Sequence, residues 1–153
     1  MSCGFQLRGA EGYDFDLGSI HISALNTRSE MVKILADTLS NQGVDISSKS
    51  EAPYSLSLLS EITHRRPVAT SGDISVSEYE LSIEVRFQVL SESNQVLIPP
   101  TSVIVEKIYS FDASSLVGSS EEETQVVAEI RRDISGQILR RLYAAMRIES
   151  ENP

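Results

Sequence analysis

Apolar and polar residues alternate along several stretches of the chain, and the alternation is longest over residues 77–90. In this stretch, "SEYELSIEVRFQVL", every second residue is apolar and its neighbours are charged or polar; the apolar set is Tyr79, Leu81, Ile83, Val85, Phe87 and Val89. A strand with this period has one buried face and one face in water. Shorter patterns predict further strands at residues 19–25, 54–66 and 101–112.

The predicted strand at residues 54–66 lies between two prolines. Its alternation places the apolar residues on one face of the strand, namely Tyr54, Leu56, Leu58 and Ile62. Pro53 and Pro67 are expected to bracket the strand, because proline cannot donate to the hydrogen-bond ladder of a sheet. For the same reason, Pro99 and Pro100 are expected to interrupt the strand that returns after the turn at residues 91–95.

A helical period begins at residue 27, in "TRSEMVKILADTLSNQG". Thr27 and Glu30 have the spacing of a capping box. In this motif the threonine side chain accepts the backbone N–H of the glutamate, and the glutamate side chain accepts the backbone N–H of the threonine. The apolar stripe of this helix consists of Met31, Val32, Leu35, Ala36 and Leu39. Gly43 is placed where a glycine commonly ends a helix.

The last element is predicted to be a long helix that starts with a second capping box, Ser120 and Glu123. Its stripe follows spacings of three and four and consists of Val127, Ile130, Ile134, Ile138, Leu142 and Met146. The three glutamates at 121–123 are interpreted as partners of the positive end of the helix dipole rather than as a calcium or acid–base site. Residues 149–153 are expected to fray.

The order of elements is strand, helix, three strands, helix. One wet strand face and two amphipathic helices predict an α+β fold, a two-layer sandwich in which both helices pack on one face of the sheet. We expect about four strands, mostly antiparallel. Residues 1–153 are predicted to form one domain, with an irregular segment at residues 1–17.

Composition narrows the function classes. The chain of 153 residues carries a formal net charge of −9, which disfavours nucleic acid because phosphate-binding surfaces need clustered Lys and Arg. No apolar run approaches the roughly 18 residues that span a bilayer. His21 and His64 stand alone in predicted strands, and no motif for a nucleophile, phosphate loop or metal site is present. We therefore predict no enzyme activity, no cofactor and no metal.

Two adjacent arginines, Arg65 and Arg66, close the predicted strand at residues 54–66. Guanidinium groups at the end of a sheet can bind phosphate through two parallel N–H bonds, which makes the pair a candidate anion site. The other interpretation is that the charges protect an exposed strand edge from pairing with other chains. The residues alone leave both interpretations open.

The single cysteine, Cys3, lies before the first patterned element. A disulfide needs a second sulfur, and a core cysteine needs neighbours to pack against, so neither role fits. A cloning remnant, a free thiol and an attachment point for a non-protein group remain as interpretations. Bacterial lipoprotein processing leaves a cysteine at its cleavage point, and on that interpretation we expect a signal peptide to have preceded Cys3.

Three stretches resemble the LptE family of lipopolysaccharide-assembly lipoproteins, in the right order over essentially the whole chain. "CGFQLRG" at residues 3–9 is similar to the family's mature N-terminus, Cys-Gly-Phe/Trp-His-Leu-Arg, with Gln6 in place of the usual histidine. Residues 77–90 resemble the family's strand that contains Glu-Tyr. Residues 121–142, "EEETQVVAEIRRDISGQILRRL", resemble its helix with an acidic start.

The resemblance implies a sheet with two helices packed on it and a lipoprotein without enzyme activity. It implies that Cys3 is the lipid-attachment site and that the chain is anchored to the periplasmic face of the Gram-negative outer membrane. The implied partners are an LptD-type β-barrel protein, which the chain plugs and supports, and lipopolysaccharide, whose assembly it assists. Family members are thought to contact lipopolysaccharide through basic residues, and here we assign that role to Arg65 and Arg66.

Two further hypotheses stay open. A lipoprotein of a different outer-membrane assembly machine can use the same sandwich as a docking module without binding lipopolysaccharide. A soluble enzyme with an unrecognised site requires a pocket that contains several titratable groups with perturbed pKa values.

Overall fold

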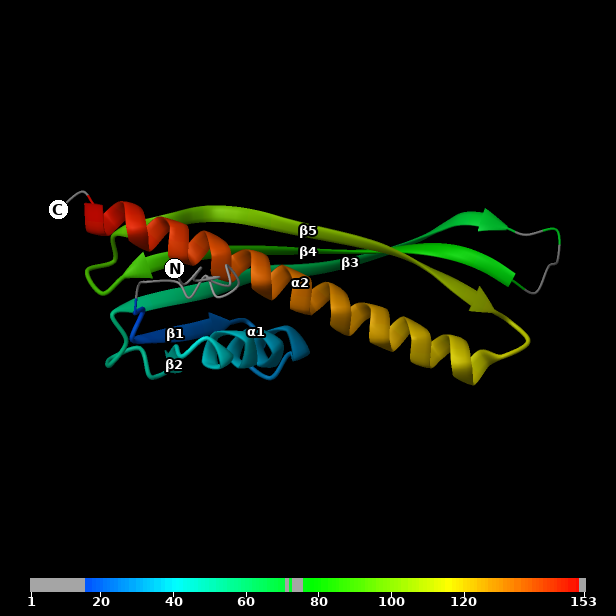
Figure 1. The fold of residues 1–153 in the computed structure, drawn as a ribbon, viewed down its shortest axis with the longest axis horizontal. Coiled ribbons are helices and arrows are strands. Elements are labelled where there is room, and N and C mark those ends of the chain that lie inside the picture. Colours follow the sequence, from blue (N-terminus) through cyan, green and yellow to red (C-terminus); the bar gives the residue numbers. More distant parts are fainter. Residues whose placement is uncertain (1–15, 71, 73–75, 152–153) are drawn as a thin grey trace, which may run out of the picture.

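The computed structural model describes residues 16–70, 72 and 76–151 of the chain. The elements, in chain order, are β1 (Ser19–Ala24), α1 (Glu30–Asn41), β2 (Asp45–Ile46), β3 (Tyr54–Thr70), β4 (Val76–Ser91), β5 (Val96–Asp112) and α2 (Leu116–Glu151). Figure 1 shows an elongated molecule in which β3, β4, β5 and α2 run along nearly the whole length. We call the end of the molecule at which β3 ends and β4 begins the distal end, and the opposite end the proximal end.

The strands form one sheet in the order β2-β1-β3-β4-β5. β4 is antiparallel to both β3 and β5, whereas β1 is parallel to both β2 and β3. The α+β class and the largely antiparallel long strands agree with the prediction, but the sheet has five strands rather than four. The additional strand, β2, is two residues long, which is too short to leave an alternating pattern in the sequence.

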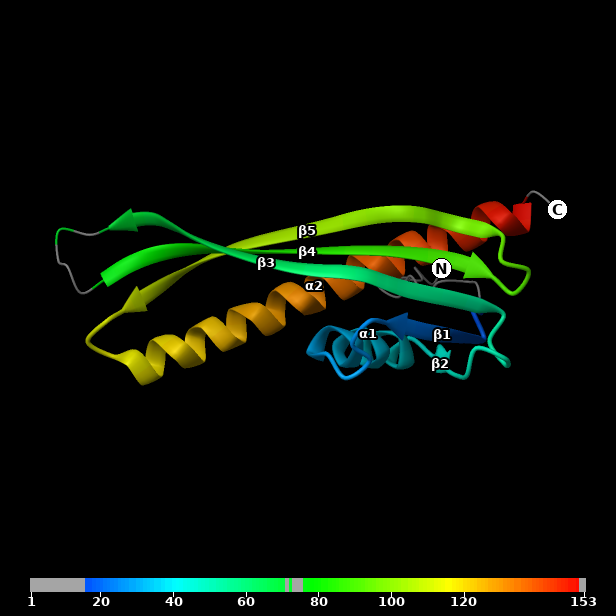
Figure 2. The ribbon, with the colours of Figure 1, turned by 180° about the vertical axis from the view of Figure 1, so that it is seen from behind.

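The helices and one face of the sheet enclose the apolar core. Leu81, Ile83, Val85, Phe87 and Val89 of β4 are all buried, as the alternation predicts. Both helices place their apolar stripes in the same core, with Met31, Leu35 and Leu39 from α1 and Ile130, Ile134, Ile138, Leu142 and Met146 from α2. In the view from behind (Figure 2), β3, β4 and β5 lie in front of α2, so the opposite face of these strands faces away from the helix. We call these two surfaces the helix face and the outer face.

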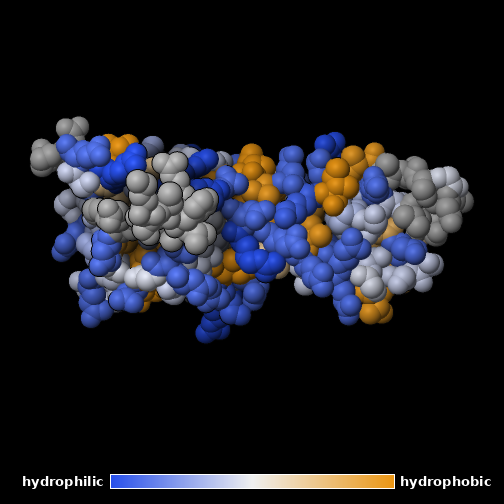
Figure 3. Space-filling view, viewed as in Figure 1, coloured by the Kyte–Doolittle hydropathy of each residue, from blue (hydrophilic) through white to orange (hydrophobic). Residues whose placement is uncertain are grey.

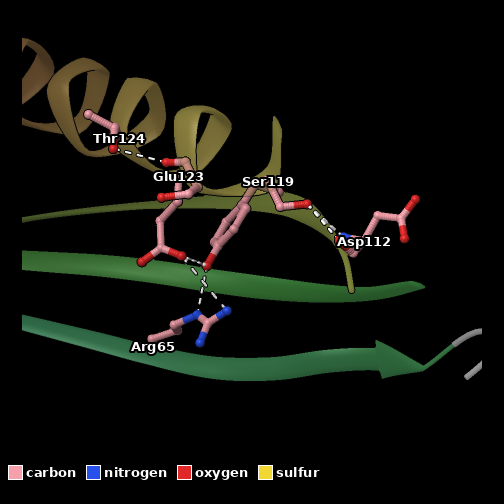
Figure 4. Close-up of polar contacts among 7 residues, drawn as sticks. Arg65, Asp112, Ser119, Glu123 and Thr124 are labelled. Atoms are coloured by element: carbon pink, nitrogen blue, oxygen red, sulfur yellow. Dashed lines mark hydrogen bonds and ion pairs between the residues drawn. The ribbon is translucent and has the colours of Figure 1, made fainter. Parts of the chain in front are cut away.

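Both predicted helix starts are wrong. α1 begins after Ser29, whose Oγ accepts the backbone N–H of Val32 at 3.3 Å, so Ser29 rather than Thr27 is the N-cap. α2 begins at Leu116, which places Ser120 inside the helix. The earlier start is stabilised by buried Ser119, whose Oγ accepts the backbone N–H of Asp112 at 2.8 Å (Figure 4).

Of the two predicted helix ends, one is confirmed and one is wrong. Gly43 has a φ of +81°, a conformation that suits a glycine directly after a helix, and this end agrees with the prediction. α2 continues to Glu151, although its pattern predicts fraying from residue 149.

A β-bulge in β3 changes which residues face the helices. The pairing of β3 with β4 shifts register between Leu58 and Ser60. Because side chains alternate between the two faces, this single extra residue moves the odd-numbered residues of β3 from Glu61 to Pro67 to the helix face. Ile62 is therefore on the outer face and 45 % exposed, so its predicted place beside Leu56 and Leu58 is wrong. Arg65 is on the helix face for the same reason.

Prolines do not end the long strands as predicted. β3 passes through Pro67, which lies opposite Tyr79, and the register shifts again between Pro67 and Ala69. β5 likewise passes through Pro99 and Pro100, beside two shifts in its pairing with β4. Both cases occur where a strand lies at the edge of the described sheet, and edge strands and bulges tolerate proline.

The distal part of the sheet extends beyond β1. β1 ends at Ala24, opposite Leu58, so in the described residues β3 has a strand partner on this side only over Tyr54–Leu58.

Charged pairs connect α2 to both outer strands of the distal sheet, β3 and β5. Arg131 bonds Glu61 of β3 at 2.8 Å, and Lys107 of β5 lies 3.1 Å from Glu129. These contacts hold the helix along the part of the sheet that α1 does not cover.

Candidate functional site

Arg65 and Arg66 lie next to each other in the distal part of β3 but point in opposite directions. Arg65 lies opposite Leu81 and Arg66 opposite Glu80, two neighbours on β4 whose side chains point to opposite faces. The two guanidinium groups therefore do not form one joint site. This separation follows from strand geometry and could be foreseen from adjacency alone, but which arginine faces the helices depends on the bulge.

Arg65 is the centre of a polar cluster that joins β3, β4, β5 and α2 on the helix face. Its Nε donates to the hydroxyl of Tyr109 at 2.7 Å, and that hydroxyl donates to Glu123 Oε2 at 2.7 Å (Figure 4). A guanidinium nitrogen of Arg65 also lies 3.8 Å from Glu123 Oε2. The guanidinium carbon lies 3.9 Å above the ring of Tyr79, within the range of a cation–π contact. We call Arg65, Tyr79, Tyr109 and Glu123 the distal cluster.

The distal cluster fixes the protonation of its phenol. Burial raises the pKa of Tyr109, and the hydrogen bond to Glu123 raises it further, while Arg65 acts in the opposite direction. For Arg65, partial burial lowers the pKa, but the bond to Tyr109 and the charge of Glu123 outweigh it, so the pKa lies above its ordinary value. At neutral pH the cluster thus holds a charged arginine in contact with a neutral phenol.

Arg66 forms a separate ion pair on the outer face. Its Nε donates to Glu80 Oε1 at 2.6 Å and a terminal nitrogen donates to Oε2 at 3.0 Å, the two-pronged geometry typical of arginine and carboxylate. The hydrogen bonds to Glu80 raise the pKa of Arg66. The Arg66 side chain remains 68 % exposed, whereas Glu80 is 14 % exposed. Of the two arginines, Arg66 therefore has the more accessible guanidinium group.

A cleft of about 550 Å³ lies on the helix face beside the distal cluster. Its floor is apolar, from Ile34, Phe111, Val127 and Ala128, and its rim carries Glu30, Arg65, Glu123 and Arg131. Figure 3 shows the corresponding notch in the outline of the molecule, between the N-terminal end of α1 and the N-terminal half of α2. Each arginine of the rim is bonded to a carboxylate, Arg65 to Glu123 and Arg131 to Glu61.

The other polar residues considered as candidates, His21, His64 and Glu123, do not come together in one site. His21 has its Nδ1 3.1 Å from the carbonyl of Ser47, and His64 is exposed on the outer face. Glu123 lies in the second turn of α2 and bonds Tyr109 instead of complementing the helix start. Among the described residues, no group of three His, Cys, Asp or Glu side chains is arranged to hold a metal ion. Cys3 lies outside the described residues, so its role stays a prediction.

The described residues also contain no helix that is long and apolar enough to cross a membrane.

Solved structures share this fold. Rare lipoprotein B from Shewanella oneidensis is 21 % identical, with a TM-score of 0.72 over 88 % of this chain and 100 % of that one. An uncharacterised lipoprotein B from Nitrosomonas europaea is 23 % identical, with a TM-score of 0.71 over 93 % and 92 %. A minor lipoprotein from Acinetobacter baumannii is 19 % identical, with a TM-score of 0.69 over 84 % and 92 %. At these identities the likeness shows the fold.

No curated protein sequence matches the chain at a significant level. The family model described as LptE, lipopolysaccharide-assembly, matches residues 17–142. The match covers most of the 153 residues and includes every helix and strand of the sandwich, except the last residues of α2. The chain therefore belongs to the LptE family of lipopolysaccharide-assembly proteins.

Proposed function

We propose that this chain is an outer-membrane lipoprotein that plugs and supports an LptD-type β-barrel and assists the assembly of lipopolysaccharide at the cell surface. The lipid is attached to Cys3, and the protein lies on the periplasmic side of the membrane. The chain acts as a subunit and carries out no catalysis of its own.

The match of the family model over residues 17–142 is the observation that carries this proposal. The shared fold with three solved lipoprotein structures supports it. The polar outer face of β4 suits a plug as well, because the interior of large outer-membrane barrels is polar. On this face β4 presents Glu78, Glu80, Ser82, Glu84 and Arg86.

Co-purification tests the proposed partner. The full chain, expressed behind a lipoprotein signal peptide and with a C-terminal tag in a Gram-negative host, is expected to bring down the host's LptD-type barrel from detergent-extracted outer membranes. A Cys3→Ala variant should leave the membrane fraction when the barrel is depleted, because several acyl chains hold a protein firmly and none would remain. If the variant stays in the membrane under these conditions, Cys3 is not the anchor.

A docking module of a different outer-membrane assembly machine is the alternative function. In that case a different barrel is recovered in the same purification, and lipopolysaccharide does not bind to the isolated chain. The identity of the recovered barrel distinguishes the two functions.

We propose that lipopolysaccharide contact involves both Arg65 and Arg66, in different ways. Arg66 is exposed on the outer face and offers its guanidinium to a phosphate, in competition with Glu80. Arg65 is held in the distal cluster and positions the strand. The net charge of −9 repels an anionic lipid at long range, so a contact of this kind depends on a local guanidinium.

Single charge reversals separate these roles. Arg66→Glu is expected to weaken the binding of purified lipopolysaccharide by about tenfold or more, and the loss should shrink at high salt. Arg86→Glu is the matched control, because it makes the same change on the outer face of β4. Equal losses in both variants would mean that the whole outer face, rather than Arg66, determines the affinity. Unchanged binding in the Arg66 variant would remove Arg66 from the proposal.

A further inference from the structure

We infer that the free edge of β3 over residues 60–66, together with the hollows beside it, binds an extended peptide segment of the barrel partner by strand addition. This inference rests on the proposed function, which supplies the partner. It concerns a surface that is distinct from the exposed guanidinium of Arg66.

The edge is open because β1 is short. β1 pairs with β3 only as far as Leu58, and beyond that point no described strand lies on this side of β3. Pro67 and the register shift after it limit the usable edge to the seven residues between the bulge and the proline. Strands in proteins are commonly about five or six residues long, so this length suffices for one added strand.

Two hollows follow this edge on the helix face. The first, of about 240 Å³, lies where β1 ends and is lined mainly by apolar residues that include Ala24, Leu25, Met31, Leu58 and Val85. The second is the cleft of about 550 Å³ beside Arg65. Glu61 lines the first hollow and Arg131 the second, and the bond between them separates the two. A strand added to the edge would place alternate side chains toward these hollows, as strand-addition complexes do.

The charges at the edge favour a peptide with uncharged inward side chains over an anion. Arg65 and Arg131, the cations that line the hollows, each form an ion pair with a carboxylate, Glu123 and Glu61 respectively. A phosphate would have to displace one of these carboxylates. An extended peptide instead offers main-chain N–H and C=O groups to the unpaired edge and needs no free charge.

The opposite edge of the sheet lacks these features and serves as an internal control. On β5, the carbonyl of Ser102 already accepts a bond from Arg141 of α2 at 3.2 Å, and Lys107 is bonded to Glu129 and Asp133 of the same helix. Pro99 and Pro100 remove two donors from this strand. Strand addition is thus expected at the β3 edge and not at the β5 edge.

Amide hydrogen exchange tests the inference on the full chain, alone and in the purified complex with the barrel partner. Exchange over residues 60–66 should slow at least about tenfold in the complex, as expected when exposed backbone groups gain partners, whereas residues 102–108 should change less. Leu25→Asp should weaken the complex by about tenfold or more. Leu25 lines the first hollow and is 97 % exposed, so the change does not disturb the core.

Leu116→Asp is the matched control variant, because Leu116 is another exposed leucine and lies far from the edge at the start of α2. It should leave the affinity unchanged. A complex that forms without protection of residues 60–66 overturns the inference and leaves the proposed function intact. If no complex with the barrel forms, the proposed function fails and the inference fails with it.

Two further outcomes would assign the edge to another occupant and overturn the inference. Slower exchange in the isolated chain at high concentration, with a dimer mass, assigns the edge to a second copy. Slower exchange on addition of lipopolysaccharide alone assigns the edge and hollows to the lipid.

Discussion

The two halves of the long sheet are stabilised in different ways. In the proximal half, β3 contributes Leu56 and Leu58, which pair with Val89 and Phe87 of β4 and pack in the apolar core. In the distal half, β4 still contributes Tyr79, Leu81 and Ile83 to the helix face, whereas its two neighbours contribute charged residues. There the helix-face residues of β3 and β5 include Glu61, Arg65 and Lys107, and each of these bonds a residue of α2.

The difference follows from what covers each half. The proximal half is enclosed by both helices, so it excludes water and gains stability from apolar burial. The distal half is covered by α2 alone, so residues beside the helix remain partly in water, where long charged side chains can keep their head groups hydrated. The comparison shows that one continuous set of strands need not have one continuous type of core.

The largest effect should come from the apolar half. Phe87 is fully buried, and Phe87→Ala is expected to lower the free energy of unfolding by about 3–5 kcal/mol, through lost burial and a cavity. Ser82→Ala, on the outer face of the same strand, should change it by less than about 0.5 kcal/mol. Urea denaturation measures both. Equal losses would mean that β4 is buried on both faces and that the two-layer description is wrong.

A smaller and local effect is expected in the distal half. Tyr109→Phe removes the hydroxyl that joins Arg65 to Glu123, and should lower the free energy of unfolding by about 1–2 kcal/mol. Amide exchange should speed up in the distal part of β3 more than in Tyr54–Leu58. Tyr54→Phe is the matched change in the proximal half. If it accelerates distal exchange as much as Tyr109→Phe does, the cluster is not what holds that half.

The cap of α1 gives an effect confined to the proximal half. Ser29→Ala removes the acceptor of the Val32 N–H and should cost about 1 kcal/mol, the usual loss for an N-cap. Thr27→Ala should leave the stability unchanged, because Thr27 is not the cap. Thermal denaturation of both variants decides between them. A larger loss for Thr27→Ala would restore the capping box that the spacing predicts.

The smallest effect concerns alkaline pH. The folded pKa of Tyr109 lies above its ordinary value of 10.0, because burial and Glu123 favour the neutral phenol. Its contribution to stability is therefore complete below pH 10.0 and falls as the pH rises through the folded pKa. Titration followed by ultraviolet absorbance should show one phenol that ionises at a higher pH than an ordinary tyrosine, and this transition should be absent in Tyr109→Phe. Since the pKa of Tyr54 is also raised, by burial first, Tyr54→Phe is needed to assign the transition.

The sequence predicted the features that depend on regular repetition. The period of two in β4 identified its buried face, and the helical stripes identified the residues that α1 and α2 bury. These patterns are strong because in each one an apolar residue recurs with the same period at five or more positions.

The features that were missed depend on a single residue or on distant ones. Leu58 and Leu59 are both apolar, so nothing in the local pattern marks the bulge, yet it decides the face of Ile62 and Arg65. At the start of α1, two hydroxyl residues compete as caps, and spacing alone selects the wrong one. The distal cluster joins Arg65 to Tyr109 and Tyr109 to Glu123, which are 44 and 14 residues apart, so no local signal could reveal it.

Helix α2 also sets a length for the whole molecule. Its 36 residues, at about 1.5 Å of rise each, give an axis of roughly 54 Å. A bilayer with its head groups is about 40–45 Å thick. The sandwich is therefore longer than the membrane is thick, and a molecule of this shape standing upright in a barrel would present its proximal and distal ends to opposite sides of the bilayer.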